Sequence, residues 1–395
     1  MEWKKYSVGT NLSFLIPTFS IFIIFFSFYS ERKLFFLIGV VLAVFSYINF
    51  IYEKNLGNKL HLINSKQQKC TFQQEETEWV ITFRNSGFPI IGGTLTIIFD
   101  KTVEPMKKAQ LESINSYHVK VPFSIGFNQE VSIKIPLIAK KRGLTKIRAI
   151  EMVIPQIFGF DKTILEYNEP FLQEILVYSK SRVVGNIDVL ESMKMGDVSV
   201  KQSLYFDYLA PVGSRDYTST DSFKQINWKA TAKMQKLQTK VFEPIADSGL
   251  HLTLNIVNNH SVIADFEEQI EYLTFVIYYL EKLKIPYSIS INFRSQGSLP
   301  FYYLPKGLGK TQLQTALKLL AVVDQLFLPY SFEKMMGYYL KHLNTQPYIL
   351  HFGNYTTDVE KIYYQIQKTN VQCMYVHAKN GEGTVRPIKR GGKFA

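Results

Sequence analysis

Two long uncharged stretches lie close together at the start of the chain and limit its fold more than any other feature. The first runs from Leu12 to Tyr29 and the second from Leu34 to Tyr52, with Ser30 to Lys33 between them. Helices of this length extend about 27–28 Å, close to the ~30 Å hydrocarbon core of a bilayer. Because helices satisfy their own backbone hydrogen bonds in lipid, the sequence predicts a transmembrane helical hairpin over residues 1–58, with spans at about 12–29 and 34–52.

A signal peptide is the alternative interpretation of the first stretch. Met1 to Lys5 form a basic start, but the apolar stretch is long for a signal peptide and no Ala-x-Ala cleavage site follows it. A second apolar stretch also comes at once. We therefore prefer the hairpin.

Basic residues around the two stretches predict the orientation of the hairpin. Four lysines flank its outer ends, whereas two basic residues occupy the turn: Lys4, Lys5, Lys54 and Lys59 against Arg32 and Lys33. Because cytoplasmic flanks carry an excess of basic residues, we expect both ends, and most of the chain, in the cytoplasm. The isolated thiols of Cys70 and Cys373 fit a reducing compartment. The predicted location is the cell membrane, with a multi-pass topology.

From residue 59 to residue 180 the pattern changes to alternation of apolar and polar side chains. The clearest alternating segments are Glu78–Arg84, Gly93–Phe99, Tyr117–Phe123 and Gln129–Pro136. Turn signals such as Asn85–Gly87 separate them. Several short strands in a region of this length predict a β-sandwich of immunoglobulin-like size.

The region from residue 249 to residue 378 alternates between strand and helix patterns. Apolar runs predict strands at Leu250–Val257, Tyr287–Phe293, Pro347–Phe352 and Val371–Val376. Helical spacing predicts helices at Ile263–Lys284, Thr311–Leu326 and Asp358–Lys368. This order predicts a multi-domain protein whose last domain is α/β, with a mostly parallel sheet covered on both faces. Residues 379–395 are expected to form a basic tail.

Two segments resemble functional motifs but lack the residues that those motifs require. Leu304–Thr311 approaches a phosphate-binding loop, but Leu304 stands where that template needs glycine, so the segment is expected to lead into a helix. The first buried strand of the α/β region ends with Asn255, Val257 and Asn259. Because neutral amides are poor replacements for carboxylate at Mg²⁺, we expect a degenerate motif and no metal.

No constellation typical of catalysis stands out elsewhere. The chain has no H-E-x-x-H pattern and no G-x-S-x-G elbow, and neither cysteine has a recognisable nucleophile context. We therefore expect no catalytic residues and no cofactor.

The segment from Asp207 to Glu243 is dense in charge yet punctuated by aromatic residues. The simplest interpretation of the segment is a charged connector within residues 181–248. Asp221 is placed to pair with Lys224 and to cap a helix start. The helical spacing predicts that Trp228, Thr231 and Ala232 pack inward, with Lys229, Lys233 and Lys236 facing outward.

The same segment resembles the signature of the bacterial domain of unknown function 58 family, roughly R-E-Y-x-x-G-D-x-x-R-x-I-[DN]-W-K-A-[ST]-A-R. The matching residues are Arg215, Asp216, Tyr217, Thr220, Asp221, Lys224, Ile226, Asn227, Trp228, Lys229, Ala230, Thr231, Ala232 and Lys233. A second match combines Lys141–Gly143 with Pro155–Phe160, similar to the family's R-G-x-Y…D-P-F-G-L element. The order of spans, β unit, signature and final domain also resembles that family.

The resemblance implies a von Willebrand A-like final domain and a membrane-anchored interaction or assembly factor. It also implies a MoxR-type AAA+ ATPase as partner, with a transglutaminase-like membrane protein as another. Thr220 replaces the signature glycine, and Lys224 and Lys233 replace arginines, which weakens bidentate recognition of carboxylate or phosphate. The candidate interaction residues are Arg215, Asp216, Tyr217, Asp221, Lys224, Asn227, Trp228, Lys229, Thr231 and Lys233.

Two other function classes remain as alternatives. A von Willebrand A-type domain suggests a metal-dependent ligand-binding or adhesion module. The formal charge of +12 suggests nucleic-acid binding, but no recognised nucleic-acid module is present. Residues 1–60 carry a net charge of +3 (six Lys/Arg, three Glu), and the part from His377 onward carries +4 (five Lys/Arg, one Glu). Much of the excess therefore lies beside the membrane or in the tail, and we expect no nucleic-acid partner.

Overall fold

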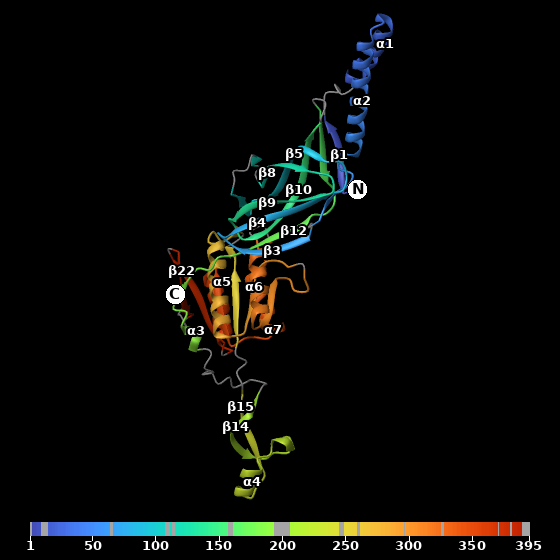
Figure 1. The fold of residues 1–395 in the computed structure, drawn as a ribbon. Coiled ribbons are helices and arrows are strands. Elements are labelled where there is room, and N and C mark those ends of the chain that lie inside the picture. Colours follow the sequence, from blue (N-terminus) through green and yellow to red (C-terminus); the bar gives the residue numbers. More distant parts are fainter. Residues whose placement is uncertain are drawn as a thin grey trace. The chain divides into compact units, whose positions relative to one another are not determined.

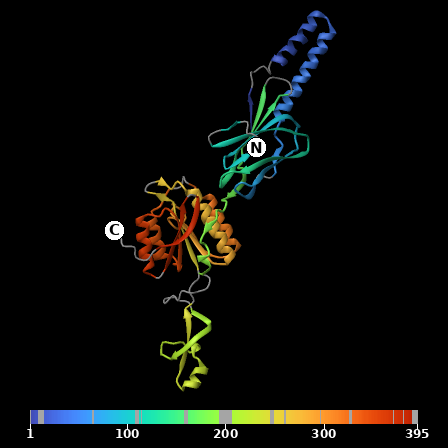
Figure 2. The same cartoon turned by 90° about the vertical axis from the view of Figure 1, so that its left-hand side faces the viewer.

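The computed structural model describes residues 2–8, 15–63, 66–106, 111–112, 115–156, 161–192, 206–244, 249–258, 261–295, 297–324, 328–369, 371–379 and 381–388. The chain divides into two compact units, Met1–Ser179 and Lys180–Ala395. Figures 1 and 2 show their elements from two directions. Each unit is described by itself.

The first unit begins with strand β1 (Trp3–Val8) and two apolar helices, α1 (Leu15–Ser30) and α2 (Lys33–Asn55). The helices lie against one another: a Cβ added at Gly39 of α2 would lie 2.6 Å from Cγ1 of Ile24 in α1. Within the described residues, only α2 is long and apolar enough to cross a membrane. The described part of α1 has 16 residues, and residues 12–14 of the expected first span lie outside the described residues.

Two sheets form the rest of this unit. The larger has the order β1-β11-β10-β5-β8-β7, with β12 joined to β10 and β3 to β12. Its further strands are β3 (Lys66–Phe72), β5 (Ile90–Asp100), β7 (Leu111–Glu112), β8 (Ser116–Ile125), β10 (Gly143–Pro155), β11 (Lys162–Tyr167) and β12 (Leu172–Tyr178). The smaller has the order β2-β4-β9-β6. Its strands are β2 (Leu60–Leu62), β4 (Glu76–Asn85), β6 (Val103–Pro105) and β9 (Gln129–Ala139).

The two sheets share one hydrophobic core. Alternate residues of β4, including Trp79, Ile81 and Phe83, are buried together with alternate residues of β5, including Leu95 and Ile97. This is the period-two pattern expected when each sheet buries one face. The prediction of a sheet-rich body after the apolar helices is confirmed, and the four predicted strands fall within β4, β5, β8 and β9.

The second unit contains a seven-stranded sheet with the order β13-β23-β22-β21-β16-β19-β20. Its strands are β13 (Val184–Gly185), β16 (Leu250–Asn255), β19 (Tyr287–Ile291), β20 (Tyr302–Gly307), β21 (Tyr348–Gly353), β22 (Gln372–Lys379) and β23 (Glu382–Pro387). The central strands β22, β21, β16 and β19 are parallel, whereas β20 and β23 each run antiparallel to their inner neighbours. Two short strands, β17 (Val257–Asn258) and β18 (Ser261–Val262), form a separate hairpin.

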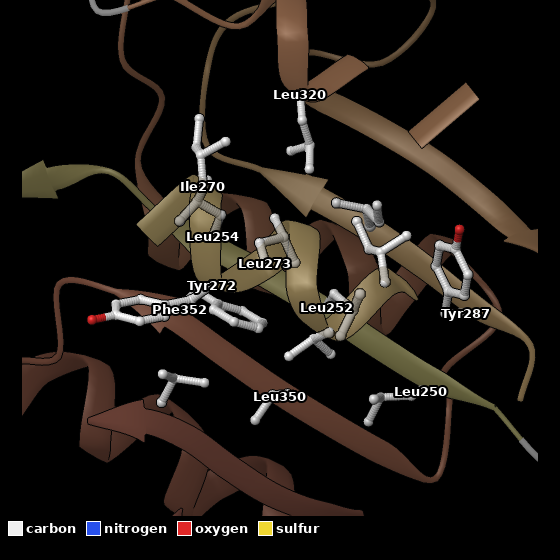
Figure 3. Close-up of a cluster of buried hydrophobic side chains, with 14 of the residues drawn as sticks. Leu250, Leu252, Leu254, Ile270, Tyr272, Leu273, Tyr287, Leu320, Leu350 and Phe352 are labelled. Carbon is white, nitrogen blue, oxygen red and sulfur yellow. The ribbon is translucent and has the colours of Figure 1, made fainter. Parts of the chain in front are cut away.

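Helices cover both faces of the sheet. The core on one face combines Leu250, Leu252 and Leu254 of β16 with side chains of α5 (Phe266–Leu283) and α6 (Lys310–Val322). Figure 3 shows Leu252 and Leu254 of β16 near Ile270 and Leu273 of α5. The core on the other face combines side chains of α7 (Phe332–His342) and α8 (Thr357–Gln367) with the sheet.

Two parts of the expected domain organisation are wrong. Residues 382–387, expected in the basic tail, form β23, which pairs with β22. Val184–Gly185, expected in the connector, pairs with β23 as β13, and Leu190 of α3 (Val189–Ser192) is buried in the same core. Pairing satisfies backbone groups that would otherwise remain at the sheet edge. Residues 389–395 of the expected tail lie outside the described residues.

Candidate functional site in the hairpin of residues 206–244

The signature segment folds as a two-stranded ribbon with a short helix in its connection (Figure 1). Strand β14 (Phe206–Asp216) runs antiparallel to β15 (Gln238–Pro244). A 3-10 turn, η3 (Phe223–Gln225), and helix α4 (Trp228–Met234) lie between them. The backbone N–H of Tyr217 donates to the carbonyl of Leu237 at 2.9 Å, which closes the ribbon at its helical end. We call residues 217–237 the hairpin tip.

Asp221 organises the hairpin tip. Its Oδ2 accepts hydrogen bonds from the backbone N–H of Thr218 (2.9 Å), the hydroxyl of Thr218 (3.0 Å) and the hydroxyl of Thr239 (3.2 Å). Its Oδ1 accepts one from Nη2 of Arg215 at 2.5 Å. The Thr218 N–H, followed by Arg215, lowers the pKa of the Asp221 carboxyl from 3.8 to about 2. The carboxylate therefore stays ionised and holds the turn to both strands.

Asn227 begins helix α4 and joins it to β15. Its side-chain Oδ1 accepts from the N–H of Ala230 at 3.2 Å, a side-chain cap at the helix start. Its backbone N–H donates to the carbonyl of Gln238 at 2.8 Å, and Gln238 N–H donates to Thr231 Oγ1 at 3.0 Å. The side chain of Gln238 also donates to Asp216. These contacts hold the short helix against the ribbon.

Three sequence expectations for this segment are wrong. Asp221 does not cap the helix, because Asn227 does, and its charged partner is Arg215 instead of Lys224. Trp228 and Ala232 do not pack inward: both are exposed, and the Trp228 side chain is 67% exposed. Among the residues that the structure describes, the seven-residue helix and the two-stranded ribbon have no second layer against which such a face could be buried.

The surface of the hairpin tip is both apolar and basic. Its exposed large apolar residues are Phe223, Trp228, Met234 and Leu237. Its exposed lysines, none of which has an acidic partner in the part of the chain that the structure describes, are Lys224, Lys229, Lys233 and Lys236. The sequence predicts ten residues for the site. Six of them make contacts that support the fold of the hairpin: Arg215, Asp216, Tyr217, Asp221, Asn227 and Thr231. The other four present their side chains to the exterior: Lys224, Trp228, Lys229 and Lys233. Periodicity gave no sign of the exposed Met234 and Leu237.

Amides interlock at the carboxyl ends of the parallel strands, where such sheets commonly bind ligands. Nδ2 of Asn292 donates to Oδ1 of Asn255, and Oδ1 of Asn292 accepts from the N–H of Ile256, both at 2.8 Å. Nδ2 of Asn255 donates to the carbonyl of Asn354 at 2.9 Å. Gly353 permits this approach, since it has a φ of +88° and an added Cβ would collide with the Asn255 carbonyl.

These contacts engage both polar atoms of the Asn255 side chain. Val257 contributes its backbone carbonyl, which accepts from Nδ2 of Asn354 at 2.6 Å. Asn259, the third member of the degenerate motif, lies outside the described residues. Among the residues that the structure describes, no group of three or more His, Cys, Asp or Glu side chains is arranged to hold a metal ion.

Two histidines are buried beneath the α7–α8 face of the sheet. His251 accepts or donates between Ser288 (2.8 Å) and Ser290 (3.0 Å) and stacks on Tyr339 at 3.8 Å. His351 contacts Thr253 and the hydroxyl of Tyr363. Burial lowers the pKa of His251 to about 3 and that of His351 to about 4. Both are neutral, enclosed and structural in these surroundings.

Comparison with known proteins gives no family. No family model and no curated protein matches the chain. A solved PapD-like domain of human CEP192 (PapD-like domain 7) is similar at 11% identity, covering 31% of this chain and 87% of that one, with a TM-score of 0.20. The sporulation control protein Spo0M of Bacillus subtilis is similar at 17% identity, covering 30% of this chain and 48% of that one, with a TM-score of 0.17. Likenesses at these scores assign no function.

Proposed function

We propose that this protein is a membrane-anchored interaction or assembly factor, without catalysis of its own, that binds its partner through the hairpin tip. The observation that carries the proposal is the exposure of Phe223, Trp228 and Met234 on an element that is held together by other residues. Asp221, Arg215 and Asn227 hold the fold of the hairpin from within. An ordered element with large exposed apolar side chains is typical of a protein-interaction site.

The strand pairing of the first unit supports two membrane crossings. Strand β1 precedes α1, yet it pairs with β11 over six residues. The indole N–H of Trp3 also donates to the carbonyl of Leu60, which follows α2, at 2.8 Å. The segments before α1 and after α2 therefore belong to one body on one side of a membrane. A crossing by α2 alone would separate them, so the return of the chain favours a crossing by α1 as well.

The fold of each unit is compatible with the architecture implied by the family resemblance. We propose that the two packed sheets are an immunoglobulin-like module and that the α/β unit is von Willebrand A-like. The four parallel central strands and the helices on both faces support the second assignment. The interlocked amides of Asn255 and Asn292 favour protein binding over metal-dependent adhesion.

The charge of the hairpin tip indicates the kind of surface that it binds. Residues 217–237 contain four lysines and one acidic residue, Asp221, whose charge is already paired with Arg215. A partner surface with apolar pockets and a carboxylate rim would complement it. With the family resemblance, this supports a MoxR-type AAA+ ATPase as partner and a transglutaminase-like membrane protein in the same assembly.

Affinity capture from detergent-solubilised membranes tests the proposal. The full chain carries an affinity tag, and bound AAA+ ATPase is quantified for wild type, Trp228→Ala and the double variant Lys229→Glu/Lys233→Glu. The matched control is Lys334→Glu/Lys341→Glu, because both lysines are exposed on the longer helix α7. Trp228 and the α4 lysines make none of the contacts that hold the hairpin, so the variants are expected to remain folded.

We expect wild type and the α7 variant to retain the ATPase, and the hairpin variants to lose most of it. Recovery of the ATPase by the charge-reversed hairpin at the wild-type level would refute the assigned site. Failure of the wild type to recover any AAA+ ATPase would refute the assigned partner.

A further inference from the structure

A pocket lies where α2 meets the β sheets. It has a volume of about 440 Å³, and its lining comprises Asn55, Asn58, Lys59, Ser86, Gly87, Phe88, Pro89 and Phe127. No acidic residue lines it. Two loops of the β unit, residues 86–89 and 126–128, therefore face the last turn of the helix and the residues just after it.

The pocket is held in shape by a buried amide. The side chain of Asn85 is 1% exposed and donates to the carbonyls of Phe88 (2.8 Å) and Gly126 (3.1 Å), which ties the two loops together. The Ser86 N–H donates to the Lys59 carbonyl at 3.1 Å, and the Lys59 stem passes over Gly87. The walls are thus set by the fold.

Tyr52 sets the depth of this pocket relative to α2. It lies one turn before the end of the helix, and its hydroxyl donates to the carbonyl of Pro89 at 2.9 Å. Its ring meets Phe88 edge-on, with centroids 6.2 Å apart. Tyrosines at helix ends lie at the level of lipid headgroups. If α2 crosses the membrane, the loop of residues 86–89 lies at that level too.

The exposed side chains match this position. Phe127 is 72% exposed and Phe88 is 42% exposed, and large aromatic rings in water are unfavourable unless another surface covers them. Lys59 is exposed and has no acidic partner among the described residues. Two aromatic rings around one free ammonium group suit the boundary between acyl chains and an anionic headgroup.

We propose that this pocket binds the headgroup of an anionic phospholipid, with Lys59 paired to its phosphate and Phe88 and Phe127 at the acyl boundary. This inference rests on the membrane anchoring proposed above. It goes beyond anchoring because it gives the β unit a defined lipid contact of its own, which holds the sheets at the bilayer surface.

Native mass spectrometry of the full chain in detergent tests the site by titration with phosphatidylglycerol or phosphatidylcholine. Loss of one lysine near a lipid surface is worth about 1 kcal/mol, so Lys59→Gln is expected to weaken phosphatidylglycerol binding about fivefold and leave phosphatidylcholine binding unchanged. Phe127→Ser is expected to weaken the binding of both lipids. Lys59→Arg, which keeps the charge, is expected to bind as wild type does.

Lys134→Gln is the matched control. Lys134 is an exposed lysine of β9 without an acidic partner among the described residues, five positions and about 17 Å along the strand from Gln129. Equal phosphatidylglycerol binding by wild type and Lys59→Gln would overturn the lipid site. Carbonate extraction of membranes is the separate test of anchoring: release of the wild-type chain into the supernatant would overturn both this site and the proposed membrane anchor.

Discussion

Arg215 and Asp221, two residues of the family-like signature, meet at the end of β14 with 2.5 Å between Nη2 and Oδ1. The guanidinium comes from the end of β14 and the carboxylate from the turn that follows it. The ion pair of the signature therefore stabilises the turn that follows β14. The residues left for a partner are the apolar side chains and lysines of the hairpin tip.

Replacing Asp221 by Asn should loosen the hairpin tip without unfolding the chain. The amide keeps the shape of the side chain but loses the charge that Arg215 and the Thr218 N–H stabilise. We expect faster amide hydrogen exchange in residues 217–237 than in the wild type, with unchanged exchange in β16 and β21. Asp358→Asn is the control, since Asp358 has an exposed ion pair with Lys361 on α8. Unchanged exchange in the hairpin tip would contradict the assigned role.

The same carboxyl predicts a pH dependence. Its pKa in the folded hairpin is about 2, below the ordinary value of 3.8. Because the pKa is lowered in the folded hairpin, the ionised Asp221 side chain stabilises the hairpin tip fully at a pH above 3.8, the ordinary pKa. This stabilisation is lost as the pH falls through about 2. Protection of the hairpin tip should decline in that acid range in the wild type and be flat there in Asp221→Asn.

The buried histidines predict a second pH effect at higher pH. In the folded chain the pKa values of His251 and His351 are lowered to about 3 and about 4, whereas an unfolded chain takes up their protons near pH 6.5. The contribution of the two neutral histidines to the free energy of unfolding is therefore fully present above about pH 6.5. As the pH drops toward about 4, the free energy of unfolding falls by up to about 1.4 kcal/mol per pH unit for each histidine.

The slope of the free energy of unfolding against pH is measured by urea unfolding of the full chain in detergent at several pH values. Hydrogen exchange of β16 and β21 monitors the unfolding. His251→Leu is expected to have a shallower slope than the wild type, even though it is less stable overall. His342→Gln is expected to keep the wild-type slope, because His342 is exposed on α7. A slope that His251→Leu leaves unchanged would exclude His251 as its source.

The interlocked amides predict that replacing Asn292 by Leu, a side chain of similar shape, lowers the free energy of unfolding. Asn292→Leu leaves the buried N–H of Ile256 without its acceptor, and Asn255 loses a donor. An unsatisfied buried polar group costs about 1–3 kcal/mol, so we expect unfolding of the α/β unit at lower urea concentration. Asn258→Leu, at an exposed position nearby, should change the midpoint little. Added Mg²⁺ should leave the wild-type midpoint unchanged, because the amide oxygens are already paired.

Sequence periodicity predicted the elements whose burial is regular. The alternation in β4 and the apolar run of β16 each mark residues that one or two packed faces bury. Helix α7 was missed although Phe332, Met335, Met336 and Tyr339 follow a helical spacing and Ser331 caps its start. Its two tyrosines and its place after a loop obscured that pattern.

Tertiary contacts determine the burial of some residues and the pairing of some strands, and local sequence patterns do not predict these. The spacing around Trp228 is that of a packed helix face, but none of the described residues forms a layer that covers it. Strand β23 has too few apolar residues to stand out, and its place comes from pairing with β22. Strand β1 is six residues long and pairs with β11, more than 150 positions away. No local signal in Trp3–Val8 indicates that partner.

The pairing of β1 with β11 makes the membrane topology testable. If both apolar helices cross, Glu31 in the turn between them lies on the opposite side of the membrane from the β sheets.

Cysteine labelling in intact cells tests this topology. Exposed Cys70 is first replaced by Ser, and Cys373 is buried. We then expect a cysteine in place of Glu31 to react with a membrane-impermeant maleimide in intact cells. If the β sheets face the cytoplasm, as the basic flanks of the apolar stretches predict, a cysteine in place of Lys134 on β9 is expected to react only after permeabilisation. Equal labelling of the two positions in intact cells would contradict the crossing by both helices. The contact between Trp3 and Leu60 holds the segments before α1 and after α2 together, so the helices would then be expected to lie along the membrane or within a single leaflet.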